Sequence, residues 1–336
     1  MKIVQISTNT LPVPPEDYGG TQRDIHYLTE ELVRRGHEVI LFAKKGSKTN
    51  ATRTYEYPTD DPDQQLDFII KRIPSNVDII HDHYGIVAKT NPPIPTLHNS
   101  HSKKAKGSQI PVFVSKKIRD KNKKGYFVHN GIRLSDYTFR TKKKGYLLFL
   151  GRIMKEKGVH LAIEVAQKTG KELIIAGTIN KPAYQEYFDS EVKPHLNEKI
   201  RFIGPVGGAK KINLISRASC VLFTSTWNEP FGLVLIESLA CGTPVLGFKA
   251  GAVPEVLKGL PQLLCNSTDD MVRKVKYRNN FPTARVCRSY VKRHFSDKVM
   301  ADNFLKLYKK VITNKEYKII RQSVWNTRKN MILKRS

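Results

Sequence analysis

Residues 146–176 read YLLFLGRIMKEKGVHLAIEVAQKTGKELIIA, and this stretch decides the fold class. An apolar run of strand length at 146–150 leads into a loop bounded by glycines. A segment at 159–168 then has the apolar spacing of a helix, and 172–176 is a second apolar run. A strand, a helix and a second strand form a βαβ unit, whose strands lie parallel in one sheet. The stretch therefore predicts an α/β protein with a doubly wound parallel sheet.

The same alternation continues on both sides of this stretch. Towards the C-terminus, the apolar runs at 200–203, 220–224 and 244–248 are separated by helical patterns, and a long amphipathic helix is expected from about 297 to 312. At the N-terminus, a strand at 2–7, a Pro/Gly-rich loop, a helix at 21–35 and a strand at 39–43 begin a separate series.

A charged linker at 140–145 separates the two series, so the sequence predicts two Rossmann-like domains. We expect an N-terminal domain at 1–140, joined by a returning C-terminal segment at 313–336, and a C-terminal domain at 141–312. Open α/β sheets bind ligands beyond the carboxyl ends of their strands. Two such edges facing each other predict a cleft between the domains.

Composition agrees with a folded protein of two domains. The chain has 336 residues, of which 40% are hydrophobic, and no run approaches the roughly 18 apolar residues of a membrane span. The N-terminus passes directly into a strand without the pattern of a signal peptide. The four cysteines are scattered and form no close pair, which favours isolated thiols in a reducing compartment. A cytoplasmic location is expected, either free or on the cytoplasmic face of the membrane.

The formal charge of +28 is concentrated in two places. Residues 103–124 contain nine Lys or Arg and one acid, Asp120, and the tail from 315 to 336 is also basic. Such a field favours anionic partners, namely phosphorylated substrates, acidic lipids or nucleic acid. A lysine-rich surface without a specific role explains the charge equally well, and both interpretations stay open.

The loop GRIMKEKG at 151–158 is the first candidate binding site. It follows the strand at 146–150 and precedes a helix, which is where α/β sheets hold phosphate. Arg152 offers a planar fork for phosphate oxygens and Lys157 a mobile charge. Together they are suited to neutralise a departing diphosphate. Basic loops are common, so an ordinary surface loop is the alternative.

The segment NEPFGLVLIES at 228–238 is the second candidate. It contains Glu229 in a loop and Glu237 about a turn and a half into the following helix. Carboxylates at these two levels suit vicinal hydroxyl groups, and the amides of Phe231, Gly232 and Leu233 start the helix. The alternative is that Glu229 only complements the helix dipole and that Glu237 is a surface residue.

Taken together, Gly-Arg-(x)4-Lys-Gly and Asn-Glu-Pro-Phe-Gly-(x)4-Glu-Ser-(x)2-Cys-Gly-Thr-Pro-Val resemble the retaining glycosyltransferases of family 4. The match covers nearly the whole second domain, in order and with the family's spacing. The resemblance implies a GT-B fold with a C-terminal helix that returns towards the first domain. It also implies transfer with retention at the anomeric carbon and no bound metal.

The resemblance also implies roles for individual residues. Arg152 and Lys157 occupy the diphosphate-binding positions, next to Gly151. Glu237 occupies the position that accepts hydrogen bonds from the ribose hydroxyls, and Glu229 lies near hydroxyls of the donor sugar. The backbone amides that line sugar and phosphate are those of Phe231, Gly232 and Leu233.

The first domain resembles the family less closely. Gly19 and Gly20 match its glycine loop, whose backbone approaches the donor phosphate, and two glycines before a helix also form a permissive anion site. His98 matches the active-site histidine. The pairs His81/His83 and His98/His101 follow predicted strands and could suggest a metal, but this spacing is weak support and the resemblance places similar histidines there without one. The domain is short for the family, so the identity of the acceptor is not carried over.

The resemblance implies a metal-independent retaining glycosyltransferase. It would move a hexose-type sugar from a UDP- or GDP-sugar, with UDP favoured, to an acceptor hydroxyl in glycan synthesis. No cofactor and no specific nucleic acid are expected, and the basic segment suggests an anionic or membrane-anchored acceptor. Two alternatives stay open. A GT-B sugar-nucleotide epimerase would not need the ordered Glu-Pro-Phe-Gly series. A polyanion- or nucleic-acid-binding protein would carry aromatics among the lysines of 103–124, where only Phe113 and the nearby Tyr126 qualify.

Overall fold

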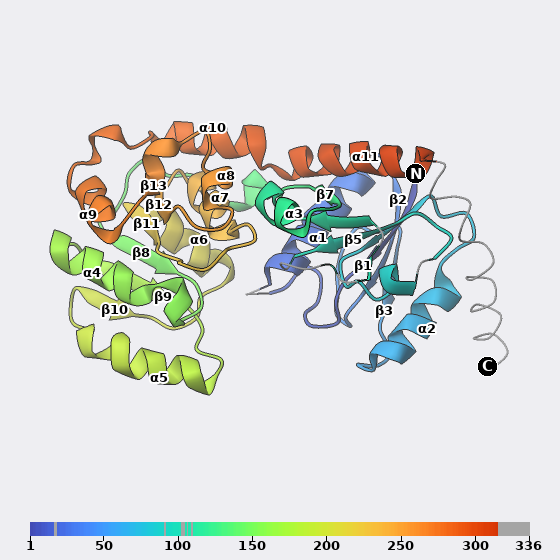
Figure 1. Cartoon of the computed structure of the whole chain (residues 1–336), viewed down its shortest axis with the longest axis horizontal. Coiled ribbons are helices and arrows are strands. Elements are labelled where there is room, and N and C mark those ends of the chain that lie inside the picture. The colour runs from blue at the N-terminus through green and yellow to red at the C-terminus, as the bar shows by residue number, and fades with distance from the viewer. Residues whose placement is uncertain (17–18, 91, 102–104, 106, 109, 315–336) are drawn as a thin grey trace. The chain divides into compact units, whose positions relative to one another are not determined.

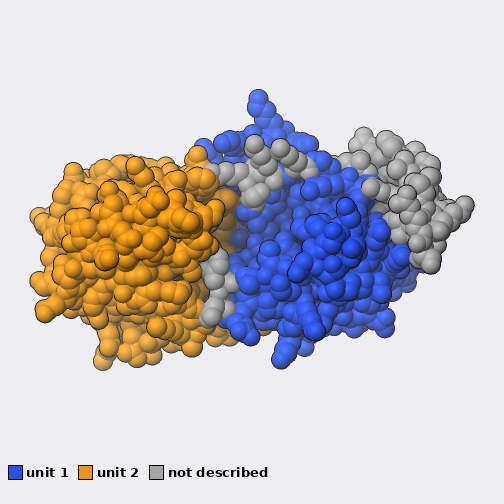
Figure 2. All heavy atoms as spheres, turned by 90° about the horizontal axis from the view of Figure 1, so that it is seen from below, with its two compact units in different colours: residues 1–131, 297–336 blue, residues 132–296 orange. Residues whose placement is uncertain are grey.

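The computed structural model describes residues 1–336 except 17–18, 91, 102–104, 106, 109 and 315–336 (Figure 1). The chain forms two compact α/β units, coloured separately in Figure 2. The first comprises residues 1–131 and the chain from 297 onward, and the second comprises residues 132–296. The two parallel-sheet α/β domains inferred from the sequence are confirmed. The tail 315–336 and parts of the basic segment 103–124 lie outside the described residues.

The unit boundaries fall earlier in the chain than the expected positions of 140 and 312. Segment 132–140 joins the second unit because Arg288 donates hydrogen bonds to the carbonyls of Leu134 and Tyr137, at 2.9 and 2.8 Å. The long C-terminal helix joins the first unit. The guanidinium of a residue about 150 positions further along the chain therefore places the linker, which no local pattern records.

The sheet of the first unit has seven parallel strands in the order β3-β2-β1-β4-β5-β6-β7. Edge strand β3 was not expected, because its four residues are polar and only half-buried at best. The elements of this unit are β1 (Lys2–Ile6), α1 (Gly20–Arg34), β2 (Glu38–Ala43), β3 (Arg53–Glu56), α2 (Pro62–Arg72), β4 (Ile79–Asp82), η1 (Ala88–Thr90), β5 (Thr96–Ser100), β6 (Ile110–Phe113), α3 (Lys116–Asn122), β7 (Tyr126–Phe127) and α11 (Asp297–Thr313).

The sheet of the second unit has six parallel strands in the order β10-β9-β8-β11-β12-β13. Its central strands are continuous apolar runs because helices cover both faces of a parallel sheet. The elements are η2 (Leu134–Asp136), β8 (Leu147–Leu150), η3 (Lys155–Lys157), α4 (Val159–Thr169), β9 (Leu173–Ala176), α5 (Pro182–Glu191), η4 (Lys193–His195), β10 (Ile200–Phe202), α6 (Gly208–Arg217), β11 (Cys220–Phe223), α7 (Leu233–Ala240), β12 (Val245–Phe248), α8 (Val253–Val256), η5 (Pro261–Leu263), β13 (Leu264–Cys265), α9 (Thr268–Lys276), η6 (Arg278–Asn280) and α10 (Ala284–His294).

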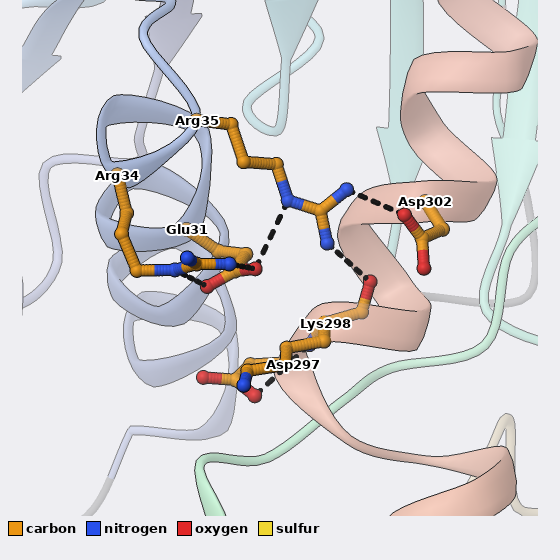
Figure 3. A network of polar contacts seen from close by, with 6 residues as sticks. All are labelled: Glu31, Arg34, Arg35, Asp297, Lys298 and Asp302. Atoms are coloured by element: carbon orange, nitrogen blue, oxygen red, sulfur yellow. Dashed lines mark hydrogen bonds and ion pairs between the residues drawn. The ribbon is translucent and has the colours of Figure 1, made fainter.

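Helix α11 is held against α1 by Arg35, the residue that follows α1 (Figure 3). Its guanidinium donates to Glu31 Oε1 on α1 at 3.0 Å. It also donates to Asp302 Oδ1 and to the Lys298 carbonyl on α11, at 2.5 and 3.0 Å. The apolar side of α11 includes Phe304, which is buried. The expected amphipathic helix is therefore confirmed, and it packs on the first unit.

Each sheet has one position where the strand order reverses. In the first unit, β1 lies beside β4, and in the second unit β8 lies beside β11. Loops that leave two such neighbouring strands diverge to opposite faces of the sheet, which opens a crevice at their carboxyl ends. The glycine loop follows β1, the loop at 151–158 follows β8, and the loop that carries Glu229 follows β11. The fold therefore places these three loops at the two reversal points.

None of the helices in the described part of the chain combines the length and the apolar character that a membrane crossing requires.

Candidate functional site

The loops after β8 and β11 are bonded directly to each other. The Thr224 hydroxyl donates to the Gly158 carbonyl at 2.7 Å, and the Thr226 amide donates to the Glu156 carbonyl at 3.0 Å. Gly158 has a φ of +71°, and a Cβ there would lie 2.2 Å from the Thr224 carbonyl oxygen. Only glycine fits this position without displacement. The two loops are therefore held together by hydrogen bonds and by close backbone packing.

This contact brings Lys157 and Glu229 together. The Lys157 amine donates to Glu229 Oε1, and the Ser225 hydroxyl donates to the same oxygen at 2.8 Å. Glu229 is buried, whereas the Lys157 side chain is 18% exposed. A buried carboxylate is tolerated when it is paired and hydrogen-bonded, as here. Ser225 was not predicted as part of the site.

Two further features of this region bear on ligand binding. The Arg152 side chain is half-buried, and within the described residues it makes no hydrogen bond or ion pair. Its guanidinium group is therefore available to bind an anion. Behind Glu229, Gly251 has a φ of +55°, and a Cβ there would lie 2.3 Å from the Glu229 nitrogen. In the sequence Gly251 indicates only a turn. The structure shows that it is needed for close backbone contact.

Helix α7 presents its N-terminus at the same edge of the sheet. Gly232 caps it with a φ of +90°, and the first turn leaves backbone amides without helical partners. Among the described residues, the amides of Gly232 and Leu233 donate no hydrogen bond. The Phe231 side chain is buried and packs edge-on against Phe295, at 5.8 Å between ring centroids. The start of α7 is therefore rigid and suited to bind negative charge.

Glu237, in the second turn of α7, is 4% exposed and not a surface residue. Its Oε1 accepts from the Lys211 amine on α6 at 2.6 Å and from the Tyr137 hydroxyl at 3.1 Å. Neither partner was predicted, because each is far from Glu237 in sequence and neither belongs to a recognisable motif. The pair of adjacent lysines at 210–211 was the only feature of the sequence that could have pointed to Lys211.

The glycine loop of the first unit leads directly into α1. Gly19 has a φ of +153°, and a Cβ there would lie 2.8 Å from the Pro15 side chain. Gln22 on the first turn donates to the hydroxyls of Thr8 and Thr10, at 2.7 and 2.9 Å. Gly19 and Gly20 therefore lie between β1 and α1, at the reversal point of the first sheet.

His98 lies within β5 and not after it, because β5 extends to Ser100. Its ring packs on Gly85, where a Cβ would lie 2.6 Å from His98 Nε2. The Asp82 carboxylate shapes this loop by accepting from four backbone amides, those of Tyr84, Gly85, Val87 and Ala88, at 2.6 to 2.9 Å. Burial lowers the pKa of His98 to about 4, so the ring is neutral at pH 7.

His81, His83 and His101 form a stack of imidazoles. Ring centroids are 4.1 Å apart between His81 and His83, and 5.3 Å apart between His83 and His101. His81 Nδ1 lies 2.5 Å from the Tyr308 hydroxyl of α11. Burial lowers the pKa of His81 to about 3 and that of His101 to about 4. In the part of the chain that the structure describes, no group of three His, Cys, Asp or Glu side chains is arranged to hold a metal ion.

Two parallel-sheet units, each with its candidate residues at a strand-order reversal, define the GT-B class of glycosyltransferase folds. Residues 135–277, which form most of the second unit, match the family Glycosyl transferases group 1. The second unit of the chain is therefore similar to the group 1 glycosyl transferases.

Known proteins are similar to this chain over part of its sequence and in its fold. The chain is 30% identical over 153 residues to a glycogen synthase of Mycobacterium tuberculosis (strain CDC 1551 / Oshkosh), a match that spans 42% of this chain and 36% of that protein. The structure is similar to that of AviGT4, a glycosyltransferase involved in avilamycin A biosynthesis, with a TM-score of 0.78 and 24% identity over 93% of this chain and 98% of that one. It is also similar to Anabaena HepE in complex with UDP-glucose, with a TM-score of 0.72 and 14% identity over 92% of this chain and 100% of that one.

Proposed function

We propose that this protein is a retaining glycosyltransferase that moves a hexose-type sugar from a nucleotide-diphosphate sugar to an acceptor hydroxyl without a metal ion. The observation that carries the proposal is the joined loop pair after β8 and β11. The joined loops carry the Lys157–Glu229 pair and Arg152, whose guanidinium has no partner among the described residues, and they lie next to the start of α7.

In the proposed reaction, negative charge develops on the diphosphate as its bond to the sugar breaks. Arg152, Lys157 and the α7 amides stabilise that charge, which is the main contribution of preorganised donors to catalysis. The acceptor hydroxyl attacks from the face that the diphosphate leaves, and a departing phosphate oxygen takes its proton. The two glutamates hold hydroxyl groups of the donor. They are not assigned as the acid and nucleophile of a glycosidase.

The remaining predicted residues complete the donor site in this proposal. Glu229 holds sugar hydroxyls, Glu237 holds the ribose diol, and the backbone of Gly151 borders the diphosphate. On the first unit, Gly19 and Gly20 approach the phosphate through their backbone, and the neutral His98 contacts the sugar or the acceptor. A uracil nucleotide is favoured, in line with the UDP-glucose bound by HepE. Neither alternative, the epimerase or the polyanion-binding protein, is favoured by the family match.

Thermal-shift measurements with UDP, GDP and their hexose derivatives, in buffer with EDTA, test the proposal. A ligand at 100 times its dissociation constant stabilises the folded state by about 2.7 kcal/mol. We expect either the UDP or the GDP compounds to raise the melting temperature of the wild type. Arg152→Ala should abolish this shift, whereas Lys155→Ala, at an exposed position of the same loop, should preserve it. No shift with any of these nucleotides, or a shift that needs Mg²⁺, would contradict the proposal.

We also propose that the acceptor is anionic or membrane-anchored and that the protein docks on acidic membrane surfaces. The support is the exposed basic group on and after α3, which comprises Lys116, Lys117, Lys121, Lys123 and Lys124. Each such residue near an anionic surface contributes about 1 kcal/mol of attraction. Cosedimentation with vesicles that contain acidic lipid should exceed that with neutral vesicles and weaken with salt. Equal sedimentation with both would refute the docking.

A further inference from the structure

The hydrogen bonds of Glu237 are all on one of its two oxygens. Lys211 and Tyr137 both donate to Oε1, at 2.6 and 3.1 Å. Oε2 accepts no hydrogen bond from any residue that the structure describes. A carboxylate has about four acceptor positions, so half of this group's capacity is left for another donor.

Glu229 has the same arrangement. Lys157 and Ser225, one lysine and one hydroxyl, donate to Oε1, and Oε2 has no partner among the described residues. Two buried glutamates eight positions apart are therefore each held by an amine and a hydroxyl on one oxygen only. Neither Oε2 is among the buried polar atoms that lack a partner, so in the described part of the chain both oxygens remain accessible to the donor groups of a ligand.

Lys211 is positioned by rigid structure and not by chance contact. It lies on α6, its side chain is 18% exposed, and the Glu237 side chain is 5% exposed. Tyr137 precedes β8, and its carbonyl accepts from Arg288 at 2.8 Å. Ordered partners that surround a carboxylate restrict its rotation, which is how supporting residues orient a binding group.

We propose that Lys211 and Tyr137 are positioning residues that orient Glu237 so that its Oε2 accepts hydrogen bonds from the two ribose hydroxyls of the donor nucleotide. This inference rests on the proposed function and extends it to residues that no motif identifies. The hydrogen bonds from Lys211 and Tyr137 fix Oε1, so the carboxylate cannot rotate freely and Oε2 is left for the diol. Lys211 itself does not touch the nucleotide.

Nucleotide affinities with and without the ribose hydroxyls test this role. Dissociation constants are measured by calorimetry for UDP and GDP and for their 2′,3′-dideoxy forms. Loss of the diol should weaken binding to the wild type about 10-fold or more, the size of a charge-assisted hydrogen bond. In Lys211→Met, binding of the intact nucleotide should weaken about 10-fold, whereas binding of the dideoxy form changes less than about 3-fold. Lys211→Arg should restore most of the discrimination.

The neighbouring Lys210→Met is the matched control, because Lys210 lies on the same helix and is exposed. It should leave both affinities unchanged. Glu237→Gln should lose the discrimination as Lys211→Met does, and Tyr137→Phe should lose part of it. Urea unfolding of each variant is compared with that of the wild type to check that every variant is folded under the conditions of the binding measurements.

Two different results would overturn the claims separately. Suppose that the wild type binds a nucleotide, and that Lys211→Met weakens binding of the intact and the dideoxy forms equally or weakens binding of neither form. The positioning role is then wrong, and the proposed function stands. If the wild type binds neither UDP nor GDP in any form, the proposed function fails, and the inference fails with it.

Discussion

The Lys157 amine is hydrogen-bonded to the Glu229 carboxylate, although 72 positions separate the two residues in the chain. Each belongs to a different sequence motif, and the pairing of β8 with β11 brings the motifs together. Lys157 is therefore held in place before any ligand binds. A preorganised charge needs little rearrangement when the diphosphate departs.

Lys157→Ala should lower the rate of sugar transfer about 100-fold or more, in line with the loss of one preorganised donor to developing charge. Stability should fall as well, because the buried Glu229 then keeps only its hydrogen bond from Ser225, so urea unfolding is measured beside the rate. Lys155→Ala is the control, since Lys155 is exposed in the same loop. The rate of donor turnover in each variant is measured as release of the nucleoside diphosphate. Equal rates in the two variants would remove Lys157 from the mechanism.

Gly158→Ala should destabilise the protein more than Gly170→Ala. Both glycines have a positive φ, +71° and +67°, which costs another residue roughly 1 kcal/mol. Only at Gly158 would the new Cβ also meet a backbone oxygen, 2.2 Å away, whereas Gly170 has nothing within 4 Å. We expect a loss of about 1 kcal/mol at Gly170 and about 3 kcal/mol at Gly158, measured by urea unfolding. Similar losses would mean that the loop contact is not tight.

Arg35→Met should loosen α11 from α1, because three hydrogen bonds join this guanidinium to Glu31, Lys298 and Asp302. We expect a loss of about 1 kcal/mol, since Asp302 is half-exposed. Arg34→Met is the control, as Arg34 bonds only to Glu31 and is mostly exposed. Hydrogen exchange in α11 should speed up in the Arg35 variant and not in the Arg34 variant. Unchanged exchange in both would show that apolar packing alone holds the helix.

Asp24→Asn should stabilise the protein, and more so at higher pH. Asp24 is 2% exposed, and neither of its carboxyl oxygens has a hydrogen-bond partner among the described residues. Burial raises the pKa of Asp24 from 3.8 to about 8, so the folded state keeps a proton that the unfolded state releases between these pH values. The stability of the wild type therefore falls as pH rises through this window, and asparagine removes the effect.

The gain from Asp24→Asn should grow by up to about 4 kcal/mol between pH 5 and pH 8, at about 1.4 kcal/mol per pH unit. Unfolding is compared with wild type at each pH. The comparison removes the pH dependence that wild type and variant share. Part of it comes from His81, His98 and His101, whose lowered pKa values make the protein lose stability as pH falls from 6.5 towards 4. Asp63→Asn, at an exposed position of α2, is the control. A gain that does not depend on pH would show that Asp24 is ionised in the fold.

Local patterns in the sequence were sufficient for the βαβ units, for the two-domain class and for placing Arg152, Lys157 and Glu229 on loops and Glu237 on a helix. Apolar periodicity and glycine-bounded loops act over a few residues. The polar edge strand β3 was missed, since an edge strand lacks the apolar run that marks a buried one. The ends of β4 and β5 were misplaced because their last residues are polar but buried.

The amino-acid sequence by itself determined which loops carry charge and which glycines permit close contact. Only the tertiary structure decided which partners those residues have. Lys211 and Tyr137 reach Glu237 because α6, α7 and the segment before β8 pack together, and Asp24 loses water because a whole unit closes around it. Pairing and burial depend on residues far apart in the chain, and no local pattern records them.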